Sequence, residues 1–98
     1  MATKKQPPPD LPPVVVTDVL DLHGFFPEQI EDVLHEYLRY AVEQGYAEVR
    51  LVHGKGKSRL KWEVQQVLRA HPAVADFRDA PPERGGWGAT IVILQPPS

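Results

Sequence analysis

Hydrophobic residues recur along the chain at two spacings, one typical of strands and one typical of amphipathic helices. The apolar residues within 19–22 predict a short strand, and the chain turns at Gly24. Pro27 suits the first position of a helix, and Gly45 suits the residue after its end. The positions between them predict an amphipathic helix with the apolar stripe Ile30, Val33, Leu34, Tyr37, Leu38 and Ala41.

The next part of the chain repeats the alternation of strand and helix. Residues 47–52 predict a second strand. Ser58 can cap a second helix, which stops at His71-Pro72. The apolar stripe of this helix comprises Leu60, Val64, Val67 and Leu68.

Two more strands are predicted near the C-terminus, over residues 74–77 and 88–95, with a loop over 79–86 between them. The order β-α-β-α-β-β implies crossover connections and at least one parallel pair of strands. We therefore expect an α/β (α+β) fold, a two-layer sandwich in which helices pack on a four-stranded mixed sheet.

The positions of proline define the expected limits of the domain. Seven of the 11 prolines lie within residues 1–13 and 96–98, and the 82 residues between carry the other four. We expect a proline-rich tail over 1–13, one domain over 14–95 and a short tail over 96–98. The first tail has no apolar run, so no signal peptide is expected.

Composition excludes several classes of protein and site. The longest apolar run, from Ile91 to Leu94, is far shorter than the ~20 residues of a membrane span, so we expect no membrane contact. Cysteine is absent, which excludes disulfides, thiolate nucleophiles and cysteine zinc sites. We expect a cytoplasmic protein, because a reducing compartment is compatible with this composition. The sequence leaves the oligomeric state open, and a monomer is compatible with it.

The net charge of -2 hides an uneven distribution of charge. Residues 14–48 carry eight acidic residues against Arg39 alone. Residues 49–62 carry no acidic residue and five basic ones, Arg50, Lys55, Lys57, Arg59 and Lys61. Such a local basic cluster is a candidate anion site, and the alternative is a solvated helix start.

The first candidate motif is Leu20-Asp21-Leu22-His23-Gly24, at the end of the first predicted strand. Alternate residues of a strand share a face, so Asp21 and His23 should project together while the two leucines enter the core. The alternative for such a histidine is a purely structural hydrogen bond.

The second candidate motif runs from His53 to Arg59, between the second strand and the second helix. Two glycines, Gly54 and Gly56, let backbone N–H groups approach an anion at the helix N-terminus. Lys55, Lys57 and Arg59 add full charges, and Ser58 adds a hydroxyl. The spacing is not that of a Walker loop, and the alternative is a simple turn.

Both motifs follow strands, and the carboxyl ends of parallel strands converge on one crevice. We therefore expect Asp21, His23 and His53 at the same rim as the glycine-lysine loop. This set suits phosphodiester chemistry: His23 or His53 moves protons, and Lys55 and the loop amides hold the phosphate. Asp21 orients an imidazole or binds a divalent ion such as Mg²⁺ or Mn²⁺.

Three residues outside the motifs carry weaker predictions. Trp87 either stacks on a base or packs over the sheet edge. Arg84 either reaches a phosphate or is an ordinary exposed loop arginine. Trp62 is predicted to lie partly in the core.

Three ordered motifs resemble those of the Smr (small MutS-related) domain family. They are the run from Leu20 to Gly24, the loop His53-Gly54-Lys55-Gly56 and the glycine-rich ending from Gly85 to Leu94. The likeness extends from about Val19 to Leu94, and the chain resembles a stand-alone member of the family. Many members carry another glycine where this chain has Ser58, which narrows access to the backbone and adds a hydroxyl donor.

The resemblance implies a fold like the C-terminal domain of bacterial translation initiation factor three. It implies an endonuclease that nicks or cleaves DNA or RNA, including messenger RNA on ribosomes, with Asp21 and His23 catalytic. The loop from His53 to Gly56 would face the phosphate. Two alternatives remain open: a non-catalytic nucleic-acid- or ribosome-binding module, and a protein-interaction domain that binds no nucleic acid.

Overall fold

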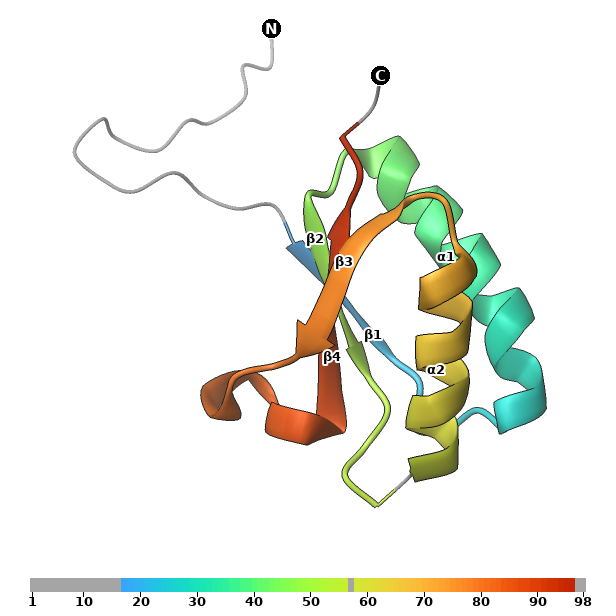
Figure 1. Cartoon of the computed structure of the whole chain (residues 1–98), viewed down its shortest axis with the longest axis vertical. Coiled ribbons are helices and arrows are strands. Elements are labelled where there is room, and N and C mark those ends of the chain that lie inside the picture. Colours follow the sequence, from blue (N-terminus) through green and yellow to red (C-terminus); the bar gives the residue numbers. More distant parts are fainter. Residues whose placement is uncertain (1–16, 57, 97–98) are drawn as a thin grey trace, which may run out of the picture.

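Strands and helices follow one another in the predicted order (Figure 1). The computed structural model describes residues 17–56 and 58–96, so the predicted N-terminal tail and Lys57 lie outside the described residues. The strands are β1 (Thr17–Asp21), β2 (Glu48–Val52), β3 (Val74–Asp79) and β4 (Ala89–Leu94). The α-helices are α1 (Ile30–Gln44) and α2 (Ser58–Ala70), and the 3-10 turns are η1 (Pro27–Gln29), η2 (Pro82–Arg84) and η3 (Gly86–Gly88).

The four strands form one mixed sheet in the order β1-β2-β4-β3. The pair β1–β2 is parallel, and β4 runs antiparallel to both of its neighbours. In Figure 1, α1 and α2 lie side by side against one face of this sheet. The predicted fold class, a two-layer sandwich with a four-stranded mixed sheet, is confirmed.

The core lies between the helices and the sheet, and the predicted stripes line it. From α1, the buried members of the stripe are Ile30, Leu34, Leu38 and Ala41, and from α2 they are Leu60, Val64 and Leu68. The sheet contributes Val49, Leu51, Val92 and Leu94 to the same cluster. Trp62 was predicted to be partly in the core, which is wrong: it is 55% exposed. Two helical positions separate it from both Leu60 and Val64, which turns its side chain away from the stripe.

The first helix begins differently from the prediction. Pro27 opens a 3-10 turn, and the α-helix starts only at Ile30. The turn is closed by two bonds: the Gln29 N–H donates to the Phe26 carbonyl at 2.9 Å, and the Phe26 N–H donates to Gln29 Oε1 at 2.8 Å. The predicted end is confirmed, because Gly45 adopts the left-handed conformation at φ 78° that terminates many helices.

The third strand is longer than predicted, because its pairing with β4 continues as far as Asp79 opposite Thr90. The predicted loop over 79–86 contains the turn η2, and the turn η3 continues to Gly88, the residue at which the fourth strand was predicted to begin. Gly85, between the two turns, has a φ of 116°. These turns lie at the same end of the molecule as the loop between β2 and α2 (Figure 1). No helix within residues 17–56 and 58–96 is both long and apolar enough to cross a membrane.

Candidate functional site

The two predicted motifs start from adjacent strand ends. Asp21 is the register partner of Val52 in the parallel pair, and the Leu22 N–H donates to the Val52 carbonyl at 2.7 Å. The chain segments that carry His23 and His53 therefore leave the sheet side by side, at the lower end of the molecule in Figure 1.

Asp21 and His23 form a hydrogen-bonded pair at the surface. Asp21 Oδ1 accepts a bond from the His23 backbone N–H at 3.0 Å and lies 2.5 Å from His23 Nδ1. The side chain of His23 is 62% exposed and that of Asp21 is 57% exposed, while Leu22 between them is fully buried. The alternation predicted for this motif is confirmed.

This pairing favours the ionised form of Asp21 and one tautomer of the His23 ring. The side-chain bond from His23, and next the bond from the His23 backbone, favour the ionised carboxylate and lower the pKa of Asp21. An ionised carboxylate only accepts hydrogen bonds, so His23 Nδ1 must carry the proton. Nε2 of His23 is then the ring nitrogen that can accept a proton from, or return one to, a reacting group.

His53 has a different environment from His23. It continues the buried face of Val49 and Leu51, and its side chain is fully buried. Its Nε2 is hydrogen-bonded to Thr90 Oγ1 at 2.8 Å, and its Nδ1 has no partner among the described residues. Burial lowers the pKa of His53. The strand ends are adjacent as predicted, but the structure pairs His53 with Thr90 rather than with Asp21 or His23.

The glycine-lysine loop is held against the turn η3. The N–H groups of His53 and Gly54 both donate to the Gly88 carbonyl, at 3.1 and 2.8 Å. The Gly54 N–H is thereby used within the fold, and Gly54 supplies a φ of 92° for the bend of the loop. At Gly56, by contrast, an added Cβ would meet nothing within 4 Å, so the backbone there faces open space.

Two basic side chains border this loop. Lys55 Nζ lies 6.0 Å from the centre of the Trp87 ring, and Trp87 is 54% exposed. Arg59, in the first turn of α2, lines a hollow together with His23 and Gly56. Lys57 and the side chain of Ser58 lie outside the described residues.

The other predicted basic residues are engaged within the fold. Arg50 Nη1 donates to the Arg84 carbonyl at 2.7 Å, and Arg84 Nη1 pairs with Glu48 Oε2 at 3.2 Å. Lys61 Nζ pairs with Asp79 Oδ1 at 2.9 Å. These contacts tie β2, β3, α2 and the turn η2 together, and they draw these charges away from the loop.

Sequence reasoning missed two aromatic residues, Phe25 and Phe26, which follow the first motif directly. They line a hollow of about 410 Å³ together with His23, Gly56 and Arg59. Phe26 is 70% exposed, whereas hydrophobic residues at helical spacing normally enter the core. The available signal was the dipeptide Phe26-Pro27, because a residue before proline is disfavoured in helical conformation.

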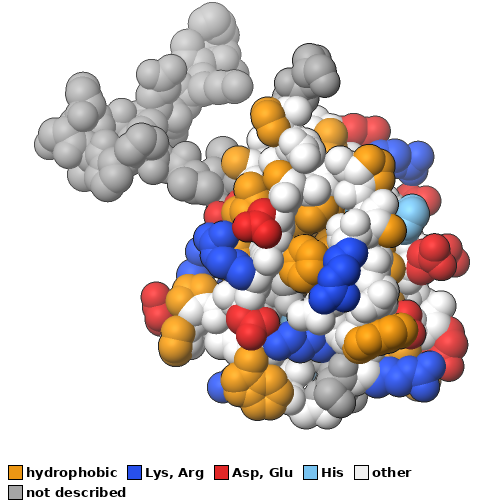
Figure 2. All heavy atoms as spheres, in the orientation of Figure 1, with side chains coloured by type: hydrophobic (Ala, Val, Ile, Leu, Met, Phe, Trp, Pro, Cys, Tyr) orange, Lys and Arg blue, Asp and Glu red, His pale blue; other side chains and the backbone are white. Residues whose placement is uncertain are grey.

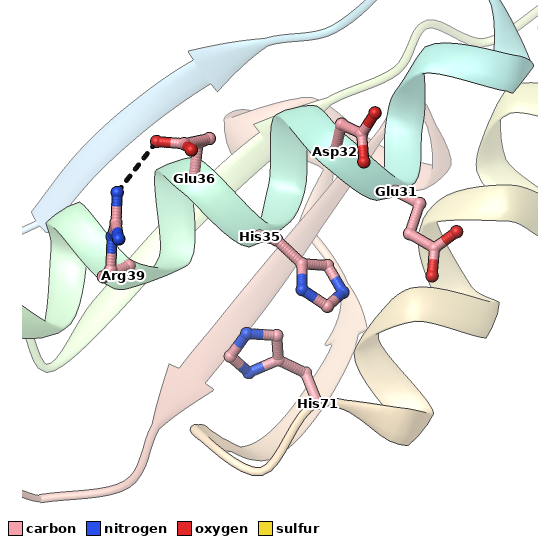
Figure 3. A pocket seen from close by; sticks show the side chains of 6 residues that line it. All are labelled: Glu31, Asp32, His35, Glu36, Arg39 and His71. Carbon is pink, nitrogen blue, oxygen red and sulfur yellow. Dashed lines mark hydrogen bonds and ion pairs between the residues drawn. The ribbon is translucent and has the colours of Figure 1, made fainter.

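A larger hollow, of about 710 Å³, lies elsewhere, beside α1 (Figure 3). Its lining comprises Glu31, Asp32, His35, Glu36, Arg39 and His71. The rings of His35 and His71 pack edge to face, with 5.2 Å between their centres. Glu36 Oε1 pairs with Arg39 Nη2 at 3.1 Å. Three carboxylates against one guanidinium disfavour phosphate there, so the hollow beside His23 is the better candidate for a phosphate ligand.

Comparison with known proteins identifies the family of this chain. The family model of the Smr domain matches residues 20–95. The chain belongs to the Smr domain family. The "Endonuclease MutS2" of Staphylococcus aureus is 42% identical over 76 residues, which cover 78% of this chain and 11% of that protein. This Smr domain thus spans about a tenth of the length of that relative.

Two solved structures share the fold of this Smr domain. The Smr domain of Thermus thermophilus MutS2 superposes with a TM-score of 0.77 at 35% identity, covering 81% of this chain and 99% of that one. YdaL, a stand-alone small MutS-related protein from Escherichia coli, superposes with a TM-score of 0.75 at 25% identity, covering 79% and 63%.

The described residues of this Smr domain offer few side-chain ligands for a metal ion. Within residues 17–56 and 58–96, no three His, Asp or Glu side chains gather as a metal site. Asp21 is the carboxylate of the first motif, and one of its oxygens already binds His23. A Mg²⁺ or Mn²⁺ ion here would need phosphate oxygens and water to complete its coordination, an arrangement that Mg²⁺ accepts in many phosphate-processing sites.

Proposed function

We propose that this Smr domain is an endonuclease that cleaves phosphodiester bonds in RNA or DNA. The observation that carries the proposal is the exposed Asp21–His23 pair: its His23 lines a hollow together with the basic residue Arg59 and the open backbone at Gly56. A proton-transfer group beside an anion site is the minimum that phosphodiester cleavage requires. The name of the Staphylococcus aureus relative, an endonuclease, supports this reading.

In the proposed mechanism, His23 acts as the general base. Its Nε2 accepts a proton from the attacking water as the new bond to phosphorus forms. As the old bond breaks, the leaving oxygen takes a proton from a solvent water, and His23 then releases its own proton to solvent. Asp21 holds the ring in the required tautomer through Nδ1 and stabilises the imidazolium. The lowered pKa keeps Asp21 ionised throughout this cycle.

The phosphate is held by the loop and the start of α2. Lys55 and Arg59 provide positive charge, and the N-terminus of α2 adds its partial charge. We assign His53 a positioning role, because it is buried and binds Thr90 on β4 while its backbone N–H binds Gly88. Through these bonds it fixes the start of the loop relative to the sheet.

A cleavage panel tests this function. The full chain is incubated with end-labelled single- and double-stranded RNA and DNA, in magnesium, manganese or EDTA. His23→Ala should lower the cleavage rate by about 10²- to 10⁴-fold, the usual contribution of a general base. Asp21→Asn should lower it as well, because an amide no longer enforces the tautomer. Activity that survives in EDTA would rule out a required divalent ion at Asp21.

Two exposed residues of α1 provide matched controls. His35→Ala and Asp32→Asn remove the same chemical groups at positions away from the strand ends, and both should leave cleavage unchanged. If His23→Ala and Asp21→Asn cut as fast as these controls, the catalytic assignment is wrong.

One observation favours a second candidate, a nucleic-acid- or ribosome-binding module without cleavage. His53 is fully buried, so His23 is the one motif histidine exposed in the described part of the chain. Binding without cleavage of any substrate, with affinity that falls steeply as salt rises, would establish this alternative. The double variant Lys55→Ala plus Lys57→Ala tests the protein-interaction domain. If it retains nucleic acid at low salt as well as the wild type does, that third alternative gains support.

A further inference from the structure

Phe26 is the most exposed of the large hydrophobic side chains in the described part of the chain, at 70%. It lies three positions after His23, on the turn that leads from β1 into α1. A single exposed phenylalanine is unremarkable on a protein surface. This one lines the same hollow as the proposed general base, His23.

The turn that carries Phe26 is well ordered by local bonds. The Phe25 N–H donates to the Leu22 carbonyl at 3.0 Å, and the Phe26 N–H donates to Gln29 Oε1 at 2.8 Å. Pro27 has a fixed φ and follows immediately. The backbone of Phe26 is thus held in an extended conformation, and its side chain is exposed to solvent. Because this backbone is already ordered, a ligand that binds the ring need not order it, which lowers the entropy cost of binding.

The lining of the hollow combines apolar residues with a basic one. Phe25, Phe26 and Pro27 come from the turn after β1, and Gly56 and Arg59 come from the loop and the start of α2. A nucleotide has the same two parts, a flat apolar base and an anionic phosphate. A phosphate placed near His23 and Arg59 would leave its neighbouring base within reach of Phe26, which lines the same hollow.

A second aromatic side chain stands on the other side of the loop. Gly88 packs against Gly54 and Lys55, which places the Trp87 turn beside the loop, and Lys55 lies over the Trp87 ring. The loop therefore has an exposed aromatic residue on each side. Figure 2 shows hydrophobic and basic side chains close together at this lower end of the molecule.

We propose that Phe26 stacks on a base next to the bound phosphate, so that the site selects unpaired over base-paired nucleic acid. The reason is that both faces of a base in a duplex are covered by its neighbours. A protein ring can stack on a base only after that base leaves the helix, which costs free energy in a duplex and little in a single strand. This inference rests on the proposed nucleic-acid function.

Fluorescence anisotropy of the full chain with a labelled oligonucleotide, single-stranded or annealed to its complement, tests the inference. Phe26→Ala should weaken single-strand binding by about 5- to 150-fold, the effect of losing one stacked base. Duplex binding, which depends on phosphate contacts, should stay unchanged. Phe26→Trp keeps a stacking ring and should retain the preference, and Tyr40→Ala removes an exposed aromatic residue on α1 as a control.

The outcomes separate the inference from the function on which it rests. A loss confined to the single strand in Phe26→Ala supports stacking. Equal losses on both substrates, or no loss on either, overturn the inference, while cleavage by the wild type in the cleavage panel still supports the proposed function. If the wild type binds neither substrate, the proposed function and this inference fail together.

Discussion

The substitution Gly88→Ala, which adds one methyl group, tests the contact between Gly88 and the glycine-lysine loop. In Gly88→Ala, the new Cβ would lie 2.7 Å from Lys55 Cγ, 3.1 Å from the Lys55 backbone nitrogen and 3.4 Å from the Gly54 carbonyl carbon. Real Cβ atoms do not approach other atoms as closely as the first distance. Rotating the lysine side chain can relieve the first contact but not the second, so the backbone of the loop must move by a few tenths of an ångström.

The size of the effect follows from these contacts. Overpacking of this kind typically costs about 1–3 kcal/mol. For a domain of this size, each kcal/mol lowers Tm by about 4–8 °C, so we expect a decrease of roughly 4–24 °C. The loop cannot move freely, because the N–H groups of His53 and Gly54 are bonded to the Gly88 carbonyl. We therefore also expect weaker binding of nucleic acid.

Thermal unfolding followed by far-UV circular dichroism measures the first effect, and fluorescence anisotropy measures the second. Gly24→Ala is the control for stability, since a Cβ at Gly24 would meet nothing within 4 Å and Gly24 does not adopt a positive φ. It should unfold at the temperature of the wild type. If Gly88→Ala also does so and binds equally well, the loop is not held by this contact.

Three further predictions concern pH, salt and the core. Burial lowers the pKa of His53, so the unfolded chain binds its proton more readily. The free energy of unfolding should therefore fall as pH drops below about 6.5, and His53→Gln should remove part of this fall in urea titrations. Lys55→Ala and Arg59→Ala should each reduce the slope of log affinity against log salt by about 1, and unchanged slopes would show that neither contacts phosphate. Leu38→Ala should cost about 2–5 kcal/mol in urea unfolding, because Leu38 is fully buried; a negligible cost would contradict its place in the core.

Much of the fold could be predicted from periodicity and turn residues alone. Helical spacing identified the stripe of α1, including Leu34 and Leu38, and Gly45 marked the end of that helix. Strand alternation identified Asp21 and His23 as neighbours on one face. These features depend on local geometry, which the order of residue types sets directly.

Other features depend on segments that are distant in sequence. Whether a basic side chain is available to a ligand at the loop depends on its partner in the fold. Lys61 forms an ion pair with Asp79 and Arg50 donates to the Arg84 carbonyl, whereas Arg59 lines the hollow beside His23. The burial of His53 against Thr90 depends in the same way on the pairing of β2 with β4.

The order of strands and helices, the core stripes and the shared face of Asp21 and His23 thus follow from the local pattern of residues. The burial of His53, the bond from the Gly54 N–H to the Gly88 carbonyl and the hollow that Phe26 shares with Arg59 follow only from the packing of distant segments. The physical reason is that backbone periodicity acts over a few residues, while burial and hydrogen-bond partners are set by which strands and loops pack together.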